Sequence, residues 1–250
     1  KKMVQFIRTF FKAIVVSSLA LSATLYADDV EEIIVKGKVL YSDQVAALKT
    51  PTAIIDVPQS LSIVTDEDIR KQGMRELGDI VRYTPGVNTS QGEGHRDSVV
   101  FRGVRSTADF YQDGTRDDVQ YYRSLYNVDQ VEVLRGPNAL LFGRGGTGGI
   151  INRVTKKAQL DEQFGSFDIG ADDFGAFDFA ADYNTSTGDS TALRLNIHFD
   201  SLENHRDLYD GDRVGFNPTL KIQMSDSTTL DLSYEYADHE RFIDRGIPTA

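Results

Sequence analysis

The 250-residue chain contains no cysteine. Neither a disulfide framework nor a thiolate metal site is therefore available to it. The histidines are few, and their spacing is not that of a metal-binding cluster. They are His95, His198, His205 and His239. The sequence predicts no metal site formed by the protein itself.

Basic residues and long apolar runs are also scarce. The chain has 27 lysines and arginines against 38 aspartates and glutamates, a net charge of −11. Such acidity argues against a nucleic-acid-binding protein, which needs a basic face for phosphates. After residue 27, no segment has eighteen consecutive apolar residues, so no membrane-spanning helix is expected there. If this part of the chain enters a membrane, it must do so as a β-barrel.

The first 27 residues have the layout of a secretory signal peptide. Four basic residues and no acid precede an apolar run, and the segment ends on the small residue Ala27. A membrane anchor is the alternative, but the apolar run is short and is interrupted by serine and threonine. Cleavage after Ala27 would remove four of the 27 basic residues and none of the 38 acids, leaving a charge of −15.

Residues 28–44 combine an acidic start with a short β-branched run, EEIIVKG at 31–37. An extended segment near a free terminus can add a strand to the sheet edge of a partner. The alternative is an ordinary first strand of the domain that follows. The residues alone leave both interpretations open.

Residues 45–160 are predicted to form an α+β domain. Thr65 and Asp68 fit a capping box at the start of one helix, and Gly73 ends that helix. A second helix is expected over 74–83, before Pro85. Strands are expected at 54–55, 61–64, 99–102, 110–112 and 128–134, and loops at 88–97, 105–109 and 115–127.

From about residue 163, apolar and polar residues alternate in five runs. The runs are 167–172, 177–183, 193–200, 213–222 and 230–236. Each has about the length of a tilted strand that crosses a bilayer, and short connectors alternate with a longer charged one at 203–212. A soluble β-sandwich also shows alternation. It would not explain five spanning-length runs behind a signal peptide, so we predict a transmembrane antiparallel β-barrel.

Three glycines, Gly143, Gly145 and Gly148, fit the G-x-G-x-x-G spacing of dinucleotide-binding loops. That fingerprint needs a helix after it. Here the β-branched run at 150–155 follows, which favours a strand. A nucleotide site is therefore the weaker interpretation of these glycines.

Several motifs, taken together and in order, resemble the TonB-dependent outer-membrane receptors, and within them the ferric-siderophore group. The motifs are EEIIVKG, VPQSLSIVT, LGDIVRYTPGV, FRGVRSTADFYQDG and VDQVEVLRGPNALLFGRGGTGGIINRVTKK. The strongest part is FRG at 101–103 combined with RGPNALLFGRGGTGGIIN at 135–152. The resemblance implies an N-terminal α+β plug in a transmembrane antiparallel β-barrel of 22 strands, of which about five are present here. The signal peptide would be 1–27, the TonB box and linker 28–44, the plug 45–160, and the first barrel strands 161–250.

The resemblance implies transport across the outer membrane of a Gram-negative bacterium, not catalysis. TonB, energised from the inner membrane, would pull on a TonB box to release tightly bound cargo. The box would be Glu31, Glu32, Ile33, Ile34, Val35, Lys36 and Gly37. Lys36 and Gly37 stand where a small hydroxyl residue and alanine are commoner. Iron would arrive only as a ferric siderophore, so no cofactor is expected.

Siderophore contacts in the family come from apical plug loops and from the barrel wall. By position, the contacts on the plug would be His95, Arg96, Arg105, Gln120, Tyr121, Tyr122 and Arg123. Arginine and tyrosine suit an anionic, aromatic iron chelate, and the tyrosine pair favours a catecholate. For each of these residues the alternative is an exposed loop position with no ligand.

Two further arginines and a set of glycines receive other roles. Arg102 and Arg135 each precede a glycine in a family motif, which implies that they fasten the plug to carboxylates of barrel strands beyond residue 250. Tight turns and close backbone contacts are expected at the structural glycines. These are Gly103, Gly136, Gly143, Gly145 and Gly148.

The chain is expected to be an N-terminal fragment, because five strands leave an open edge that lipid does not tolerate. Only a few residues separate the expected cleavage site from the expected TonB box, so no periplasmic signalling domain is expected between them. Another scarce cargo, such as haem, cobalamin or an oligosaccharide, is the alternative within the family. An exported nucleotide-binding enzyme, based on GRGGTGG alone, is the alternative from a different class.

Overall fold

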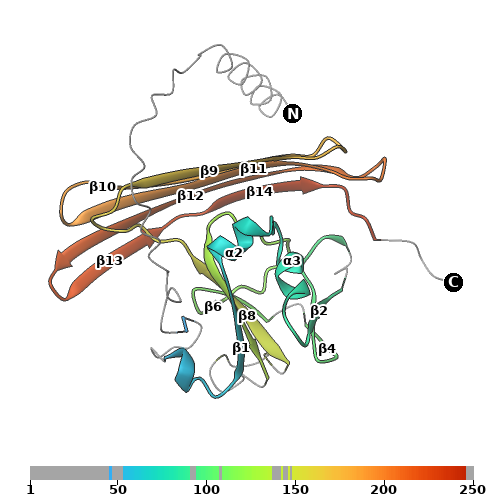
Figure 1. The fold of residues 1–250 in the computed structure, drawn as a ribbon, viewed down its shortest axis with the longest axis horizontal. Helices are drawn as coiled ribbons and strands as arrows, with labels where there is room; N and C mark the ends of the chain where they lie inside the picture. Colours follow the sequence, from blue (N-terminus) through green and yellow to red (C-terminus); the bar gives the residue numbers. More distant parts are fainter. Residues whose placement is uncertain are drawn as a thin grey trace, which may run out of the picture. The chain divides into compact units, whose positions relative to one another are not determined.

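The computed structural model describes residues 45–46, 53–90, 94–106, 109–136, 142, 146 and 148–245. Two sheets dominate this part of the chain, as Figure 1 shows. We call residues 45–160 the plug and the sheet formed by residues 164–241 the wall sheet. The expected signal peptide, the expected TonB box, Gly143 and Gly145 lie outside the described residues.

A five-stranded sheet is the centre of the plug, with the strand order β1-β7-β8-β5-β6. Its strands are β1 (Ser60–Thr65), β5 (Phe110–Gln112), β6 (Thr115–Arg116), β7 (Val128–Arg135) and β8 (Gly149–Thr155). All neighbours are antiparallel except β5 and β8, which run parallel. The residues that follow the glycine-rich motif therefore form a strand, as expected, and not the helix that a dinucleotide site requires.

Two short helices cover one face of this sheet. Helix α2 (Asp66–Lys71) begins with the predicted capping box, in which Thr65 and Asp68 hydrogen-bond reciprocally. Helix α3 (Leu77–Arg82) begins three residues later than predicted. The reason is local: the Asp79 carboxylate accepts the backbone N–H groups of Arg75 and Glu76, which places the helix start after them.

The plug buries apolar side chains on both faces of its sheet. On the helical face, Leu77 and Ile80 pack with Val131 and Val133 in one cluster. On the other face, a second cluster is formed by Val45, Tyr111, Leu134, Phe142 and Ile150. Burying a side chain of this size contributes about 1.5–3 kcal/mol, so the two clusters stabilise the sheet together with the helices packed on it.

Several local predictions in the plug were wrong; the expected loops 105–109 and 115–127, for example, each begin with residues that form strands. Residues 54–55 do not form a strand, because Ile54–Asp56 is a 3₁₀ turn (η1) closed by the hydrogen bond from Val57 N–H to Ile54 O. The expected loop 88–97 begins with strand β2 (Val87–Thr89), which pairs with β3 (Val99–Phe101). Strand β4 (Val104–Ser106) completes this small sheet. Strand β2 forms by pairing with β3, which a local pattern does not report, whereas η1 is closed by a hydrogen bond within the turn itself.

The wall sheet is a continuous antiparallel meander. Its strands are β9 (Phe164–Ala171), β10 (Phe177–Ser186), β11 (Thr191–Glu203), β12 (Asp210–Ser225), β13 (Thr228–Ser233) and β14 (Tyr236–Arg241). Both β13 and β14 pair with β12, so they are two halves of one strand, and the five predicted runs are five strands in space. The short turns 187–190 and 226–227 lie at one end of this sheet, and the connectors 172–176 and 204–209 lie at the other.

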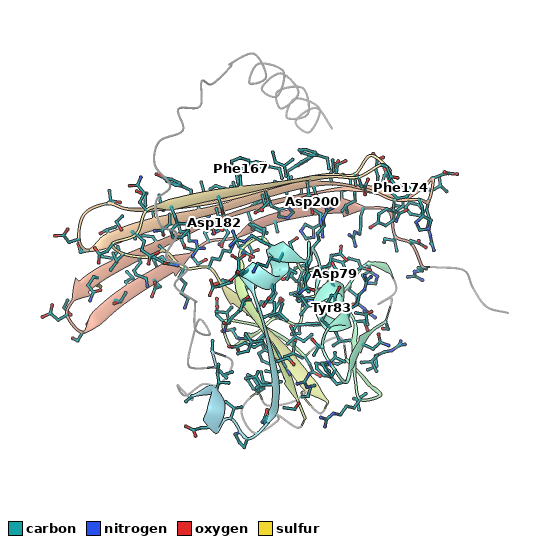
Figure 2. The ribbon with its side chains drawn as sticks, in the orientation of Figure 1. Asp79, Tyr83, Phe167, Phe174, Asp182 and Asp200 are labelled. Atoms are coloured by element: carbon teal, nitrogen blue, oxygen red, sulfur yellow. The ribbon has the colours of Figure 1, made fainter. Side chains whose placement is uncertain are left out.

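On the wall sheet, apolar side chains lie on the outer face and polar side chains lie on the inner face, toward the plug. Large apolar residues such as Phe167, 71% exposed, point away from the plug, whereas Asp182 and Asp200 point toward it, as Figure 2 shows. The inner face is a buried row of polar side chains that includes Asn184, Arg194 and Asn217. This pattern is the one that a lipid-facing barrel requires. No helix in the described part of the chain is long and apolar enough to cross a membrane.

Candidate functional site

The third apical loop (residues 117–123) is fixed to the plug by Arg123. Its guanidinium is 1% exposed and donates to the Asp117 carboxylate, to the Asp97 carboxylate and to three backbone carbonyls. Its face lies 4.2 Å from the ring centroid of Phe110. All of its N–H groups are therefore directed into the protein. Arg123 is therefore a buried structural cation of the plug, and its contact with cargo stays a prediction.

Asp117 joins the same loop to the sheet. One carboxylate oxygen, Oδ2, accepts from Arg123 Nε at 2.9 Å, from Arg153 Nη2 at 2.8 Å and from the Tyr121 hydroxyl at 2.8 Å. Burial acts to raise the pKa of Asp117, but the two guanidinium groups outweigh it and hold that pKa below its ordinary value. Since Arg153 lies on β8, this carboxylate links the loop to a central strand of the plug.

Four of the remaining predicted residues come together at the end of the wall sheet that carries the longer connectors. Arg96 Nη1 donates to Gln120 Oε1 and so joins the first apical loop, of which residues 94–98 are described, to the third. The Tyr121 ring lies 6.5 Å from the ring of His239, and the Arg241 guanidinium lies 4.1 Å from the ring centroid of Tyr122. Burial raises the pKa of both tyrosine phenols, so they stay protonated at neutral pH.

The other predicted residues are placed differently. His95 is half-buried in the first loop. Arg105 is exposed on β4, on the side of the plug away from the wall sheet (Figure 1). Arg102 and Arg135 lie against Gly86, and Arg135 donates to Ser60 and to the Pro85 carbonyl.

The glycines of the plug show why side chains are excluded at two positions. Gly103 has a φ of +91° and follows Arg102, with a φ of +46°, in the β3–β4 hairpin. A hairpin turn with two positive φ values favours glycine. At Gly148, an added Cβ would lie 2.7 Å from the Cβ of Phe101, so the backbone packs directly on that side chain.

Ion pairs connect the plug to the inner face of the wall sheet. Glu76 Oε1 lies 3.1 Å from Arg213 Nη1 on β12 and 2.9 Å from Arg241 Nη2 on β14. Next to it, Arg75 pairs with Asp178 on β10. A second group of contacts joins Lys156 to Asp182 at 3.2 Å and Ser124 to His198 at 3.3 Å. The plug therefore supplies both acids and bases to this interface.

Most of these contacts were not predicted from the sequence. Glu76 fell inside an expected helix, and Arg241 lies beyond the last predicted run. The alternation of apolar and polar residues did predict that Arg213 and His198, at polar positions, lie on the inner face of the barrel. The alternating pattern shows which residues of the wall sheet face the plug, but it does not identify their partners in the plug.

Comparisons with known proteins agree with this geometry. Residues 53–150 match the family model of the TonB-dependent Receptor Plug Domain. The chain is 32% identical to the probable TonB-dependent receptor BfrD of Bordetella pertussis over 205 residues, 80% of this chain and 28% of that protein. It is 29% identical to the catecholate siderophore receptor Fiu of Escherichia coli K12 over 247 residues, 94% of this chain and 32% of that protein.

A solved structure shares both parts of the fold. The crystal structure of the siderophore receptor PiuA from Acinetobacter baumannii matches with a TM-score of 0.73 and 27% identity, over 80% of this chain and 29% of that one. The chain spans less than a third of the length of these relatives. The predicted plug and first barrel strands are confirmed, and the chain belongs to the TonB-dependent receptors.

Proposed function

We propose that the full-length receptor binds a ferric siderophore and imports it across the outer membrane by TonB-dependent transport. One observation carries the proposal: Arg96, Gln120, Tyr121 and Tyr122 gather beside Arg241 at the long-connector end of the wall sheet. The names of two relatives support it, since one is a catecholate siderophore receptor and the other a siderophore receptor.

The chemistry of this site suits an anionic, aromatic iron chelate. Guanidinium groups offer directional donors to catecholate oxygens, and phenol rings offer stacking surfaces. His239 adds an imidazole beside Tyr121. Iron enters as part of the cargo, so the receptor needs no cofactor of its own and catalyses no reaction.

Coupling to energy is proposed for residues 31–37, the expected TonB box. Tight capture makes dissociation slow, so release of cargo requires work on the plug. A strand added to the sheet edge of TonB resists pulling through its main-chain hydrogen bonds. Arg102 and Arg135 are proposed to fasten the plug to carboxylates of barrel strands beyond residue 250, because guanidinium groups that those strands would bury need such partners.

Equilibrium binding to the detergent-solubilised full-length receptor tests the cargo. Ferric siderophores, haem, cobalamin, oligosaccharides, NAD and ATP are titrated in parallel. Nanomolar binding of a ferric siderophore, with none of the other ligands bound comparably, is expected. Selective binding of haem, cobalamin or an oligosaccharide would replace the cargo but keep the family mechanism. Binding of a nucleotide alone would refute transport of ferric siderophores.

A further inference from the structure

Arg241 is shared between the third apical loop and the plug interior. Its guanidinium lies 4.1 Å from the ring centroid of Tyr122, and its Nη2 lies 2.9 Å from Glu76 Oε1. The Arg241 side chain is 12% exposed, so it is reachable from outside yet largely desolvated. A cation over an aromatic ring in such a position is a ready partner for an anion.

Glu76 is the anion that now holds this arginine. Its carboxylate is 30% exposed, and the same oxygen also contacts Arg213 at 3.1 Å. Arg213 is 2% exposed and pairs in addition with Asp200. The charges of these four residues cancel, because the guanidinium groups of Arg241 and Arg213 face the carboxylates of Glu76 and Asp200.

We propose that Arg241 and Tyr122 form the subsite for the anionic edge of the cargo, and that Glu76 is an internal anion displaced from Arg241 when cargo binds. The inference rests on the proposed function, because it takes the cargo to be a negatively charged ferric siderophore. An uncharged chelate has no reason to compete with Glu76.

The charges around the site make the displacement feasible. If Glu76 leaves, the buried Arg213 keeps the carboxylate of Asp200, so no buried cation is left without a partner. Glu76 itself can turn toward water because its side chain is already partly exposed. An incoming anion would replace the charge that Arg241 loses.

Displacement would also loosen the plug. Glu76 immediately precedes α3 and forms a backbone bridge with Ser124. Its two ion pairs hold the start of this helix against β12 and β14. Binding of cargo and fastening of α3 are then linked, and linkage is reciprocal: the factor by which bound cargo weakens the Glu76 pairs equals the factor by which those pairs weaken cargo binding.

Matched variants of the full-length receptor in detergent test the proposal with two probes. One is the iron(III) complex of a hexadentate tris-catecholate, which is trianionic, and the other is the iron(III) complex of a hexadentate tris-hydroxamate, which is uncharged. We expect Glu76→Gln to bind the tris-catecholate about 5-fold more tightly than wild type. Arg241→Gln should bind it about 10-fold more weakly, and neither change should alter binding of the tris-hydroxamate.

Arg75→Gln is the control, because Arg75 is the neighbouring residue and pairs with Asp178 on the same wall sheet without contacting the third loop. It should bind both probes as wild type does. Hydrogen exchange supplies the second readout: the tris-catecholate should speed exchange of amides in residues 76–82 of wild type and add nothing in Glu76→Gln.

The outcomes distinguish failure of the proposed function from failure of the internal-anion proposal. If wild type binds neither probe, both are wrong. If wild type binds the tris-catecholate but Glu76→Gln binds it equally or more weakly, or if Arg75→Gln behaves as Glu76→Gln does, only the internal-anion proposal is overturned. It is overturned in the same way if residues 76–82 exchange at one rate with and without the probe.

Discussion

Asp117 gives the sharpest test of how the third apical loop is held. The perturbation is Asp117→Ala, which removes a carboxylate that accepts hydrogen bonds from Arg123, Arg153 and Tyr121. Both arginines are at most 3% exposed, so each loses part of the charge that compensates its burial. Breaking a buried ion pair by removing one partner costs about 3–5 kcal/mol.

That cost can be measured as local opening. Because 1.36 kcal/mol corresponds to a factor of ten, amide exchange in the loop should accelerate by about 10²- to 10⁴-fold. The reporters are the backbone N–H groups of Asp97, Asp117 and Arg123, each of which is hydrogen-bonded in the folded loop. Hydrogen–deuterium exchange of the full-length receptor in detergent, followed by mass spectrometry of peptides that cover these amides, provides the assay.

The neighbouring Asp118 supplies the control. It carries the same charge and lies on the exposed side of the loop, so Asp118→Ala should change stability by less than about 0.5 kcal/mol and exchange by about twofold or less. Equal acceleration in both variants would show that loop charge matters and the network does not. No acceleration in Asp117→Ala would refute the assignment of Asp117 as the anchor.

Two other predictions concern the plug. Burial raises the pKa of Asp97 to about 6, in spite of the opposing Arg123 N–H groups. The folded protein therefore holds this proton up to a higher pH than the unfolded chain does, and the stability that Asp97 contributes falls as pH rises from 3.8 through about 6. Asp97→Asn should remove this pH dependence from the amide exchange rates of the first loop. Gly148→Ala should destabilise the plug by about 1–3 kcal/mol because its Cβ meets Phe101, whereas Gly78→Ala on α3, with 3.7 Å to its nearest neighbour, should be neutral or stabilising in thermal melts of the receptor.

The strand periodicity of the barrel could be predicted from the sequence because it depends on local alternation. Phe167 and Asp182 fall on opposite faces by the period of two alone. The capping box at Thr65 is equally local. The conformation of residues 87–89 depends on pairing with β3, and that prediction failed. The strand expected at 54–55 also failed, although the 3₁₀ turn found there is closed by a local hydrogen bond.

The candidate site could be predicted only in part. Loop position and residue type predicted siderophore contacts at Arg96, Gln120, Tyr121 and Tyr122. In the structure these residues lie near one another. The same reasoning assigned Arg123 to cargo, because nothing in its neighbours indicates the acids at 97 and 117 that pair with it. A surface loop and a buried network can share one sequence pattern when the partners lie far apart in the chain.

Uptake of radioactive iron into cells tests the central claim most directly. Cells that depend on this receptor are supplied with a ferric tris-catecholate labelled with radioactive iron, and the full-length receptor is compared with a variant that lacks residues 31–37. The account predicts that both receptors bind the chelate at the cell surface and that only the intact one accumulates iron, in a manner that stops when the proton gradient is collapsed. Equal accumulation by both receptors, or accumulation that persists without the gradient, would contradict TonB-dependent transport.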